Sequence, residues 1–184
     1  MRIIAGIAKG MPLAVPRSGV RPTADRIREA VFSRLGDRVI GATVLDLFAG
    51  TGALGLEAAS RGALSVMFVE QSRAALVSLQ KNLKAFRKGR EVSCELTVLR
   101  GDAFAQLRKL AGASEKFSLI LADPPYGDAA QSLVEDKNLP ALLTTGGLFV
   151  LESAKRDELR LPAAWRLIRE SVYGDTGVSF LAEA

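Results

Sequence analysis

The sequence contains no histidine and one cysteine, Cys94, among its 184 residues. A single thiol cannot form an internal disulfide, and without imidazole groups too few ligands remain for a structural zinc site, so we expect no bound metal. Hydrolases and dehydrogenases commonly move protons through histidine near neutral pH. The missing histidine therefore favours chemistry that depends on positioning and electrostatics instead.

Long hydrophobic runs are also absent. The first apolar stretch, Ile3 to Ala8, ends at Lys9, and no segment approaches the roughly 18 apolar residues of a membrane-spanning helix. We therefore expect a cytoplasmic protein. With 48% hydrophobic residues, a chain of this length can bury a core without disulfides, and we expect one compact, monomeric domain.

Positive charge is concentrated near the start of the chain. Residues 1–41 hold 8 basic and 3 acidic side chains, which accounts for the whole net charge of +5, and the rest of the chain is neutral. Because arginine and lysine neutralise phosphates, this excess favours a local surface for a polyanion. A solvated basic face explains the charge equally well.

The first 40 residues read as an arm followed by a helix. Residues 1–15 alternate loosely between glycines and prolines, which predicts a small hairpin or extended arm outside the core. An apolar stripe at helical spacing predicts a helix from Thr23, its expected N-cap, to Leu35. We therefore divide the chain into an arm and helix over 1–40 and a main domain over 41–184.

The main domain alternates short apolar strands with helices. Strands are expected at residues 43–48, 65–70, 92–99, 117–122, 147–152, 166–172 and 178–181. Helices are expected at residues 53–60, 73–85, 104–110 and around 133–143. This alternation predicts an α/β fold with a parallel, doubly wound sheet, and the short connection before the last strand predicts an antiparallel final pair.

A glycine-rich turn follows the first expected strand, with Gly50, Gly52 and Gly55 in the segment that begins at Asp46. Small residues there let a ligand approach the backbone, and Glu70 ends the next strand, where an acid would bind ribose hydroxyls. The pattern taken alone also fits a nicotinamide cofactor. Asp46 would repel a pyrophosphate, however, and favours a ligand that carries an amine or a sulfonium.

A rigid turn, Asp123-Pro124-Pro125-Tyr126, follows the strand expected at 117–122. Adjacent prolines remove two backbone donors and leave carbonyls and the Asp123 carboxylate as fixed acceptors. These acceptors suit an amino group, with Asp123 and the Pro124 carbonyl each taking one N–H, while Tyr126 would stack on an unstacked base. An ordinary proline turn with a packed tyrosine is the alternative.

Asp102 follows the third expected strand, in the segment Gly101-Asp102-Ala103. It is a candidate to meet the amino group of an adenine ring. A helix N-cap is an equally good role for Asp102, and both roles can hold together.

Several segments together resemble the bacterial RsmD-type methyltransferases, which modify guanine N2 in small-subunit ribosomal RNA. The resemblance extends over nearly the whole chain and rests on residues 2–6, 21–30, 46–55, 123–126 and 173–176. The second segment, Arg-Pro-Thr-Ala-Asp-Arg-Ile-Arg-Glu-Ala, discriminates best, because the glycine turn and the proline motif recur across many amino-methyltransferases.

The resemblance implies a Rossmann-like class I methyltransferase fold with a seven-stranded sheet, S-adenosylmethionine as the cofactor, and ribosomal RNA, within an assembling small ribosomal subunit, as the partner. Implied cofactor-binding residues are Asp46, Phe48, Gly50, Gly52, Glu70, Gln71, Asp102 and Ala103. Implied catalytic residues are Asp123, Pro124 and Tyr126. Implied RNA-binding residues are Arg17, Arg21, Thr23, Arg26 and Arg28.

Three other functions stay open at this point. An adenine-N6 methyltransferase acting on DNA or RNA would use the same proline motif, although 184 residues leave no room for a separate target-recognition domain. A nicotinamide oxidoreductase fits the glycine turn but is disfavoured by Asp46 and Asp123. A non-catalytic RNA-binding module would explain the basic N-terminal region alone.

Overall fold

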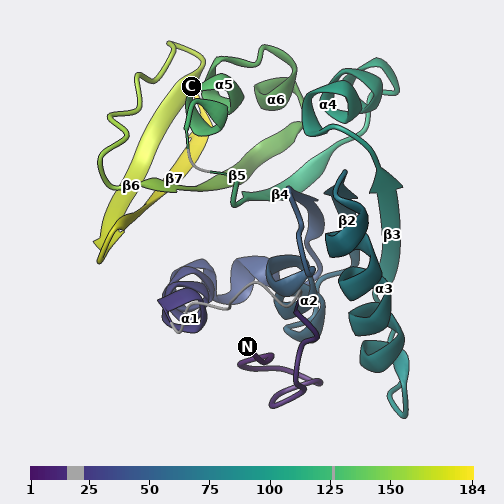
Figure 1. The fold of residues 1–184 in the computed structure, drawn as a ribbon. Helices are drawn as coiled ribbons and strands as arrows, with labels where there is room; N and C mark the ends of the chain where they lie inside the picture. Colours follow the sequence, from purple (N-terminus) through teal and green to yellow (C-terminus); the bar gives the residue numbers. More distant parts are fainter. Residues whose placement is uncertain (16–22, 126) are drawn as a thin grey trace.

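A seven-stranded sheet with the order β3-β2-β1-β4-β5-β7-β6 forms the centre of the computed structural model, which describes residues 1–15, 23–125 and 127–184 (Figure 1). Its strands are β1 (Thr43–Leu47), β2 (Ser65–Glu70), β3 (Glu95–Arg100), β4 (Phe117–Ala122), β5 (Leu143–Ala154), β6 (Trp165–Tyr173) and β7 (Thr176–Glu183). Strands β1 to β5 are parallel, and β7 runs antiparallel to both of its neighbours. The predicted fold class, with an antiparallel last strand, is confirmed.

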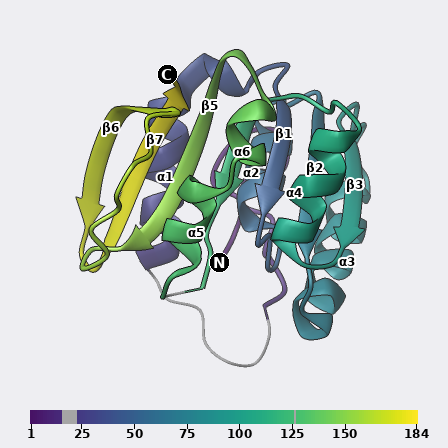
Figure 2. The same cartoon turned by 90° about the horizontal axis from the view of Figure 1, so that it is seen from above.

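Helices cover both faces of the sheet. They are α1 (Thr23–Leu35), the 3-10 turn η1 (Gly36–Val39), α2 (Ala53–Ser60), α3 (Arg73–Arg87), α4 (Ala103–Gly112), α5 (Ala129–Glu135) and α6 (Asn138–Ala141). Helices α1 to α3 lie on one face and α4 to α6 on the other (Figure 1), and the view from above looks onto the face that α4 to α6 cover (Figure 2). Within the described ranges, no helix is long and apolar enough to cross a membrane.

Strand residues divide between two cores according to their position. Val44 of β1 packs in the core beneath α1, α2 and α3, while its neighbour Leu45 packs in the core beneath α4, α5 and α6. Successive side chains of a strand point to opposite faces, so a sheet covered on both sides needs continuous apolar strands. This requirement explains why short apolar runs predicted most strands correctly.

Two predicted elements need correction. The third strand begins at Glu95 rather than at residue 92, and the helix expected around 133–143 is replaced by α5, α6 and the start of β5. The Asp136 side chain accepts the backbone N–H of Asn138 at 2.8 Å. This local bond offers the backbone an alternative to a helical turn, which separates α5 from α6.

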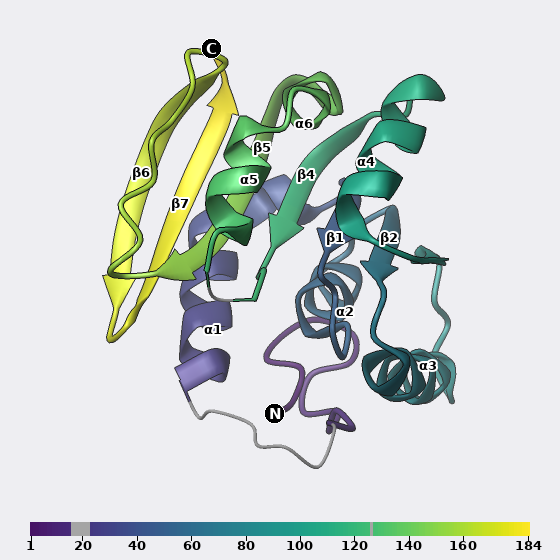
Figure 3. The ribbon, with the colours of Figure 1, turned by 45° about the horizontal axis from the view of Figure 1, so that its top comes forward.

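The N-terminal arm belongs to the core, which corrects the prediction that it lies outside. Ile3 and Ala8 are buried together with Met11 and Leu13, and the segment runs beside α2 (Figure 3). The Ile7 backbone N–H donates to the Ser60 carbonyl at 2.8 Å. The approach is so close that a Cβ on Gly6 would lie 1.7 Å from that carbonyl oxygen. The arm therefore covers apolar surface of α2 that would otherwise face water.

Candidate active site

A cleft of about 360 Å³ opens at the carboxyl ends of β1 to β4. It is lined by Phe48, Val69, Glu70, Gln71, Ser72, Gly101, Ala103, Asp123 and Pro125. The strand order reverses direction between β1 and β4, and parallel sheets bind ligands at such a switch point. The volume lies within the roughly 300–1,000 Å³ range of small-molecule sites. The geometry therefore offers a ligand site at the place that the turn motifs predicted.

Glu70 holds the wall of the cleft through backbone hydrogen bonds. One carboxylate oxygen accepts the N–H of Gly50 at 2.7 Å, and the other accepts the N–H groups of Gln71 at 2.9 Å and Ser72 at 2.7 Å. Bonds from backbone N–H groups to an ionised carboxylate are stronger than bonds between neutral groups. Glu70 thereby fixes the glycine turn after β1 against the loop after β2.

Asp46 lies behind the wall of the cleft rather than on it. Its side chain is buried and accepts the backbone N–H of Gly55 at 2.9 Å. Burial raises the pKa of Asp46 to about 7, an effect that the Gly55 N–H opposes and that the neighbouring carboxyls of Asp123 and Glu70 increase. The structure thus gives Asp46 an observed contact with the first turn of α2, and its predicted contact with a ligand stays a prediction.

Gly50 and Gly52 shape the turn in different ways. Gly52 precedes α2 with a φ of +79°, and a Cβ there would lie 2.4 Å from a methyl carbon of Leu79. A larger residue at position 52 would be strained by its backbone angle and by this contact. At Gly50, by contrast, an added Cβ would meet only the Phe48 carbonyl, at 3.8 Å, so the backbone there is open to a ligand.

Phe48 adopts a backbone angle that is unusual for its side chain. Its φ is +56°, and its ring lines the cleft and packs edge-on against Phe104, with 6.3 Å between the ring centroids. A residue other than glycine in the left-handed region costs of order 1 kcal/mol, and such strain is concentrated at functional sites. The Phe48 geometry is therefore typical of a residue that shapes a binding site.

Asp102 caps the next helix. Its side chain accepts the backbone N–H of Ala105 at 2.9 Å, which makes it the N-cap of α4. Its neighbours Gly101 and Ala103 line the cleft, whereas Asp102 itself is exposed at the edge. The capping role is observed, and the contact with an adenine amino group stays a prediction.

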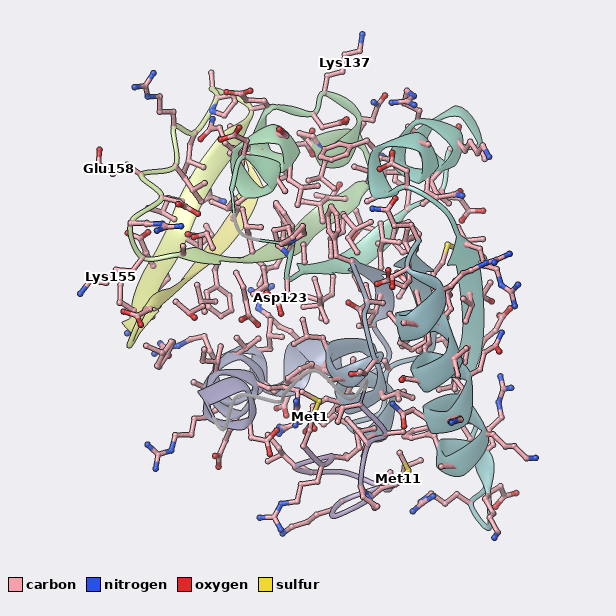
Figure 4. All side chains as sticks on the ribbon, in the orientation of Figure 1. Met1, Met11, Asp123, Lys137, Lys155 and Glu158 are labelled. Carbon is pink, nitrogen blue, oxygen red and sulfur yellow. The ribbon has the colours of Figure 1, made fainter. Side chains whose placement is uncertain are left out.

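Asp123 follows β4 directly and lines the cleft (Figure 4). Its side chain keeps access to solvent, but the surrounding protein still raises the pKa of its carboxyl to about 6 through desolvation. Pro124 is buried and Pro125 lines the cleft. Tyr126 lies outside the described residues.

Glu152 is a titratable residue that the sequence analysis missed. Leu151 of β5 pairs with Ala122 of β4, so Glu152 stands beside Asp123 on the neighbouring strand. Desolvation raises the pKa of Glu152 to about 8, and nearby Asp123 and Asp46 add to this rise, while Arg28 opposes it. A lone carboxyl at the end of an apolar strand was the signal that could have revealed it.

Arg28 lies inside the fold, which corrects its predicted role as an RNA-binding residue. It is 2% exposed. Its guanidinium donates to Asp25 at 2.9 Å and to the Arg2 carbonyl, and its Nε lies 3.6 Å from a carboxylate oxygen of the buried Glu57. A side chain held in this way cannot reach a phosphate, so Arg28 joins α1, α2 and the N-terminal arm.

Arg26 has a different environment from Arg28. It is exposed and lines a second groove of about 360 Å³, together with Arg2 and Lys9 of the arm. Among the other predicted RNA-binding residues, Thr23 begins α1, whereas Arg17 and Arg21 lie outside the described residues. Of the two predicted contacts whose side chains the structure describes, Arg28 and Arg26, it is therefore Arg26 that stays available to RNA.

Comparisons with known proteins identify relatives over almost the whole chain. A family model described as conserved hypothetical protein 95 matches residues 1–182. Ribosomal RNA small subunit methyltransferase D of Escherichia coli (strain K12) is 37% identical over 180 residues, which cover 95% of this chain and 85% of that protein.

Solved structures show the same likeness. A hypothetical protein of Thermus thermophilus, TTHA0928, has a TM-score of 0.79 and 32% sequence identity, with 100% of this chain and 99% of that chain covered. Protein SMU.776, solved as a complex with SAH, has a TM-score of 0.65 over 88% of this chain and 50% of its own. Its identity is only 15%, so this likeness shows a shared fold alone.

Proposed function

The chain belongs to the family described as conserved hypothetical protein 95, in agreement with the RsmD-type resemblance, and we propose that it transfers a methyl group from S-adenosylmethionine to ribosomal RNA. The name of the E. coli relative supports the reaction and the RNA substrate. One observation in this chain carries the proposal: Glu70 at the end of β2 and Asp123 after β4 line the same cleft.

The residues of the cleft fit the chemistry of this cofactor. Glu70 would accept hydrogen bonds from ribose hydroxyls, and the open backbone at Gly50 would admit the cofactor beside the turn. Phe48 and Ala103 would supply apolar contacts. When bound, S-adenosylmethionine supplies a methyl group already activated by the positive sulfonium, a charge that the surrounding carboxyls favour. SAH, found in the structure of SMU.776, is the same molecule without that methyl group.

Asp123 and Pro124 would hold the accepting amine. The Asp123 carboxylate accepts one N–H and the Pro124 carbonyl accepts the other, so that the nitrogen lone pair is directed into the cleft. The pKa of Asp123, raised to about 6, lies close to neutral pH. It can therefore also accept the proton that the amine releases after methylation.

Within ribosomal RNA we propose the exocyclic N2 of a guanine in the small subunit as the methyl acceptor, on an assembling subunit. The family resemblance supports this choice, and the exposed Arg26, Lys9 and Arg2 supply positive charge for phosphates. In the proposed division of the chain, residues 1–40 carry the RNA-facing surface, although the arm also contributes to the core.

Methyl transfer from labelled S-adenosylmethionine tests the proposal. Undermodified small ribosomal subunits, naked small-subunit RNA and duplex DNA are offered in parallel, and the product nucleosides are identified. We expect N2-methylguanosine from the ribosomal substrates. N6-methyladenosine in RNA, or N6-methyladenine in the DNA, would keep the reaction but replace the substrate, whereas cofactor binding without any transfer would overturn the enzymatic role.

A further inference from the structure

Carboxyl groups from three neighbouring strands lie on one face of the sheet. In the order β1-β4-β5, Asp46 belongs to β1, Asp123 follows β4 and Glu152 belongs to β5. Leu121 and Val150 pack in the core on the side of α1 and α2, and residues two positions apart in a strand share a face. The side chains of Asp123 and Glu152 are therefore expected on the same face of the sheet, the one that α1 covers, and on neighbouring strands.

Glu152 differs from Asp46 in what holds its carboxyl. Asp46 accepts the Gly55 N–H, whereas the Glu152 side chain makes no hydrogen bond to another residue that the structure describes, although its backbone belongs to the β5–β7 pairing. Across from Glu152 stands Arg28 of α1, which is already bonded to Asp25. Strand β7 places the apolar Val178 beside Glu152. The Glu152 carboxyl is thus half-buried near the site. Among the described residues, no hydrogen-bond partner explains its position there.

The position of Glu152 along the sheet edge relates it to the substrate. Among the described residues, the lining of the cleft runs from the ends of β3, β2 and β1 to Asp123 and Pro125 after β4, and Glu152 lies one strand further, on β5. An amine held at Asp123 would face the cleft on its β1 side. The ring atoms next to the amine would then lie over β5, where Glu152 can meet them.

We propose that Glu152 contacts the edge of the target base next to its amine and thereby selects guanine over adenine. This inference rests on the proposed function. In guanine the ring nitrogen N1 carries a hydrogen, which an ionised carboxyl accepts, whereas N1 of adenine is an acceptor that the same carboxyl repels. The proposal therefore assigns Glu152 to base recognition, beside Asp123, which holds the amine.

Discrimination requires the ionised form of Glu152, because a protonated carboxyl could donate its hydrogen to the unprotonated N1 of adenine. Desolvation raises its pKa to about 8, with Asp123 and Asp46 adding to the rise and Arg28 opposing it. Selection for guanine is therefore expected to strengthen as the pH rises from about 6.5 to about 8.5 in the wild-type protein. A Glu152→Gln variant has no titrating group at this position and should show a flat selection over the same interval.

An RNA fragment around the mapped target nucleotide provides the test. Guanosine at that position is replaced by 2-aminopurine riboside, which keeps the amine but lacks the hydrogen on N1. Wild-type kcat/KM should favour guanosine by about 10- to 100-fold, the range of a specific base contact. In Glu152→Gln and Glu152→Ala this ratio should fall to within about threefold. Glu158→Gln, an exposed glutamate on the following loop, is the matched control and should keep the wild-type ratio.

A binding measurement separates this inference from the proposed function. Without cofactor, Glu152→Ala should bind the guanosine fragment more weakly than the wild type does, and the fluorescent 2-aminopurine fragment at least as tightly, because the carboxyl that repels its N1 is gone. An unchanged ratio and unchanged affinities in the folded Glu152→Gln protein would overturn the role of Glu152 while methyl transfer stands. A wild-type protein that methylates no RNA would instead overturn the proposed function on which the inference rests.

Discussion

Acidic side chains on the two sides of the cleft are held in opposite ways. On the β2 side, Glu70 accepts three backbone N–H groups. On the β4–β5 side, desolvation by the surrounding protein raises the pKa of Asp123 to about 6 and that of Glu152 to about 8. The comparison indicates that the two sides have different roles. The β2 side uses a fixed acceptor to hold a ligand, whereas the carboxyls of the β4–β5 side have pKa values near pH 7 and can exchange protons there.

Asp123→Asn should give the largest effect, because it removes the proton acceptor on the substrate side and keeps the side-chain shape. We expect methyl transfer to fall by about 100- to 10,000-fold, the usual range for general acid–base groups, while the affinity for SAH is retained. Single-turnover transfer and calorimetric titration measure the two quantities. The matched control is Asp128→Asn, an exposed residue outside this cleft. Loss of SAH binding would place Asp123 on the cofactor side.

Arg28→Ala tests how much the buried arginine of α1 contributes to the stability of the fold. The change removes the buried guanidinium that donates to Asp25 and to the Arg2 carbonyl, whereas Glu57 keeps its ion pair with Arg61 at 2.7 Å, so we expect a cost of about 1–3 kcal/mol from the groups left unsatisfied. Urea unfolding measures the loss.

Arg26→Ala, on the exposed side of the same helix, should leave unfolding unchanged and reduce the salt dependence of RNA binding by about one unit of slope. Equal destabilisation by both variants would contradict the distinction.

Glu70→Gln tests the ligand-holding side. A glutamine has one acceptor oxygen and presents an NH₂ group to backbone donors that face Glu70, at a cost of about 1–3 kcal/mol for an unsatisfied buried group. We expect SAH to bind about 10- to 100-fold more weakly, with little change in the rate at saturating cofactor. Glu95→Gln, exposed on β3, is the control. Normal SAH affinity with a slower rate would assign Glu70 to the substrate side instead.

The smallest effect concerns the pH dependence of stability. The pKa of Asp46 is about 7 in the folded chain and 3.8 ordinarily, so folding favours its protonated form. Its stabilising contribution is complete below about pH 4 and is lost as the pH rises through about 7. In Asp46→Asn, the difference in unfolding free energy between about pH 6 and about pH 8 should shrink by about 1–2 kcal/mol.

Urea titrations at both pH values measure this change, with Asp37→Asn, which is exposed in η1, as the control. The remaining pH dependence is expected to arise from Asp123 and Glu152, since their pKa values are also raised. An identical pH dependence in Asp46→Asn and the wild type would show that Asp46 does not titrate in this interval.

Much of the cleft was predictable because its residues follow strand ends. Glu70 and Asp123 were singled out from the turns at strand ends, and Phe48, Gln71 and Ala103 from the family resemblance; all five line one cleft. Carboxyl ends of parallel strands meet at one edge of a sheet, so residues that are distant in sequence but follow successive strands come together there. Their roles toward cofactor and substrate stay predictions that the experiments above address.

Other parts could not be read from the sequence. The arm was expected outside the core because its glycines and prolines resemble a loop, yet Ile3 is fully buried against segments more than fifty residues away. Glu152 carries no motif, and its place beside Asp123 follows from the pairing of β5 with β4. Arg28 and Arg26 are two positions apart in one helix and have opposite environments.

The sequence by itself determined the order and type of most elements and the positions of the glycine and proline turns, because these depend on hydrophobic periodicity and on local backbone preferences. Only the tertiary structure decided which arginine is buried and which carboxyls have raised pKa values. Desolvation and ion pairing at Arg28, Asp46 and Glu152 arise from segments that meet only when the chain folds.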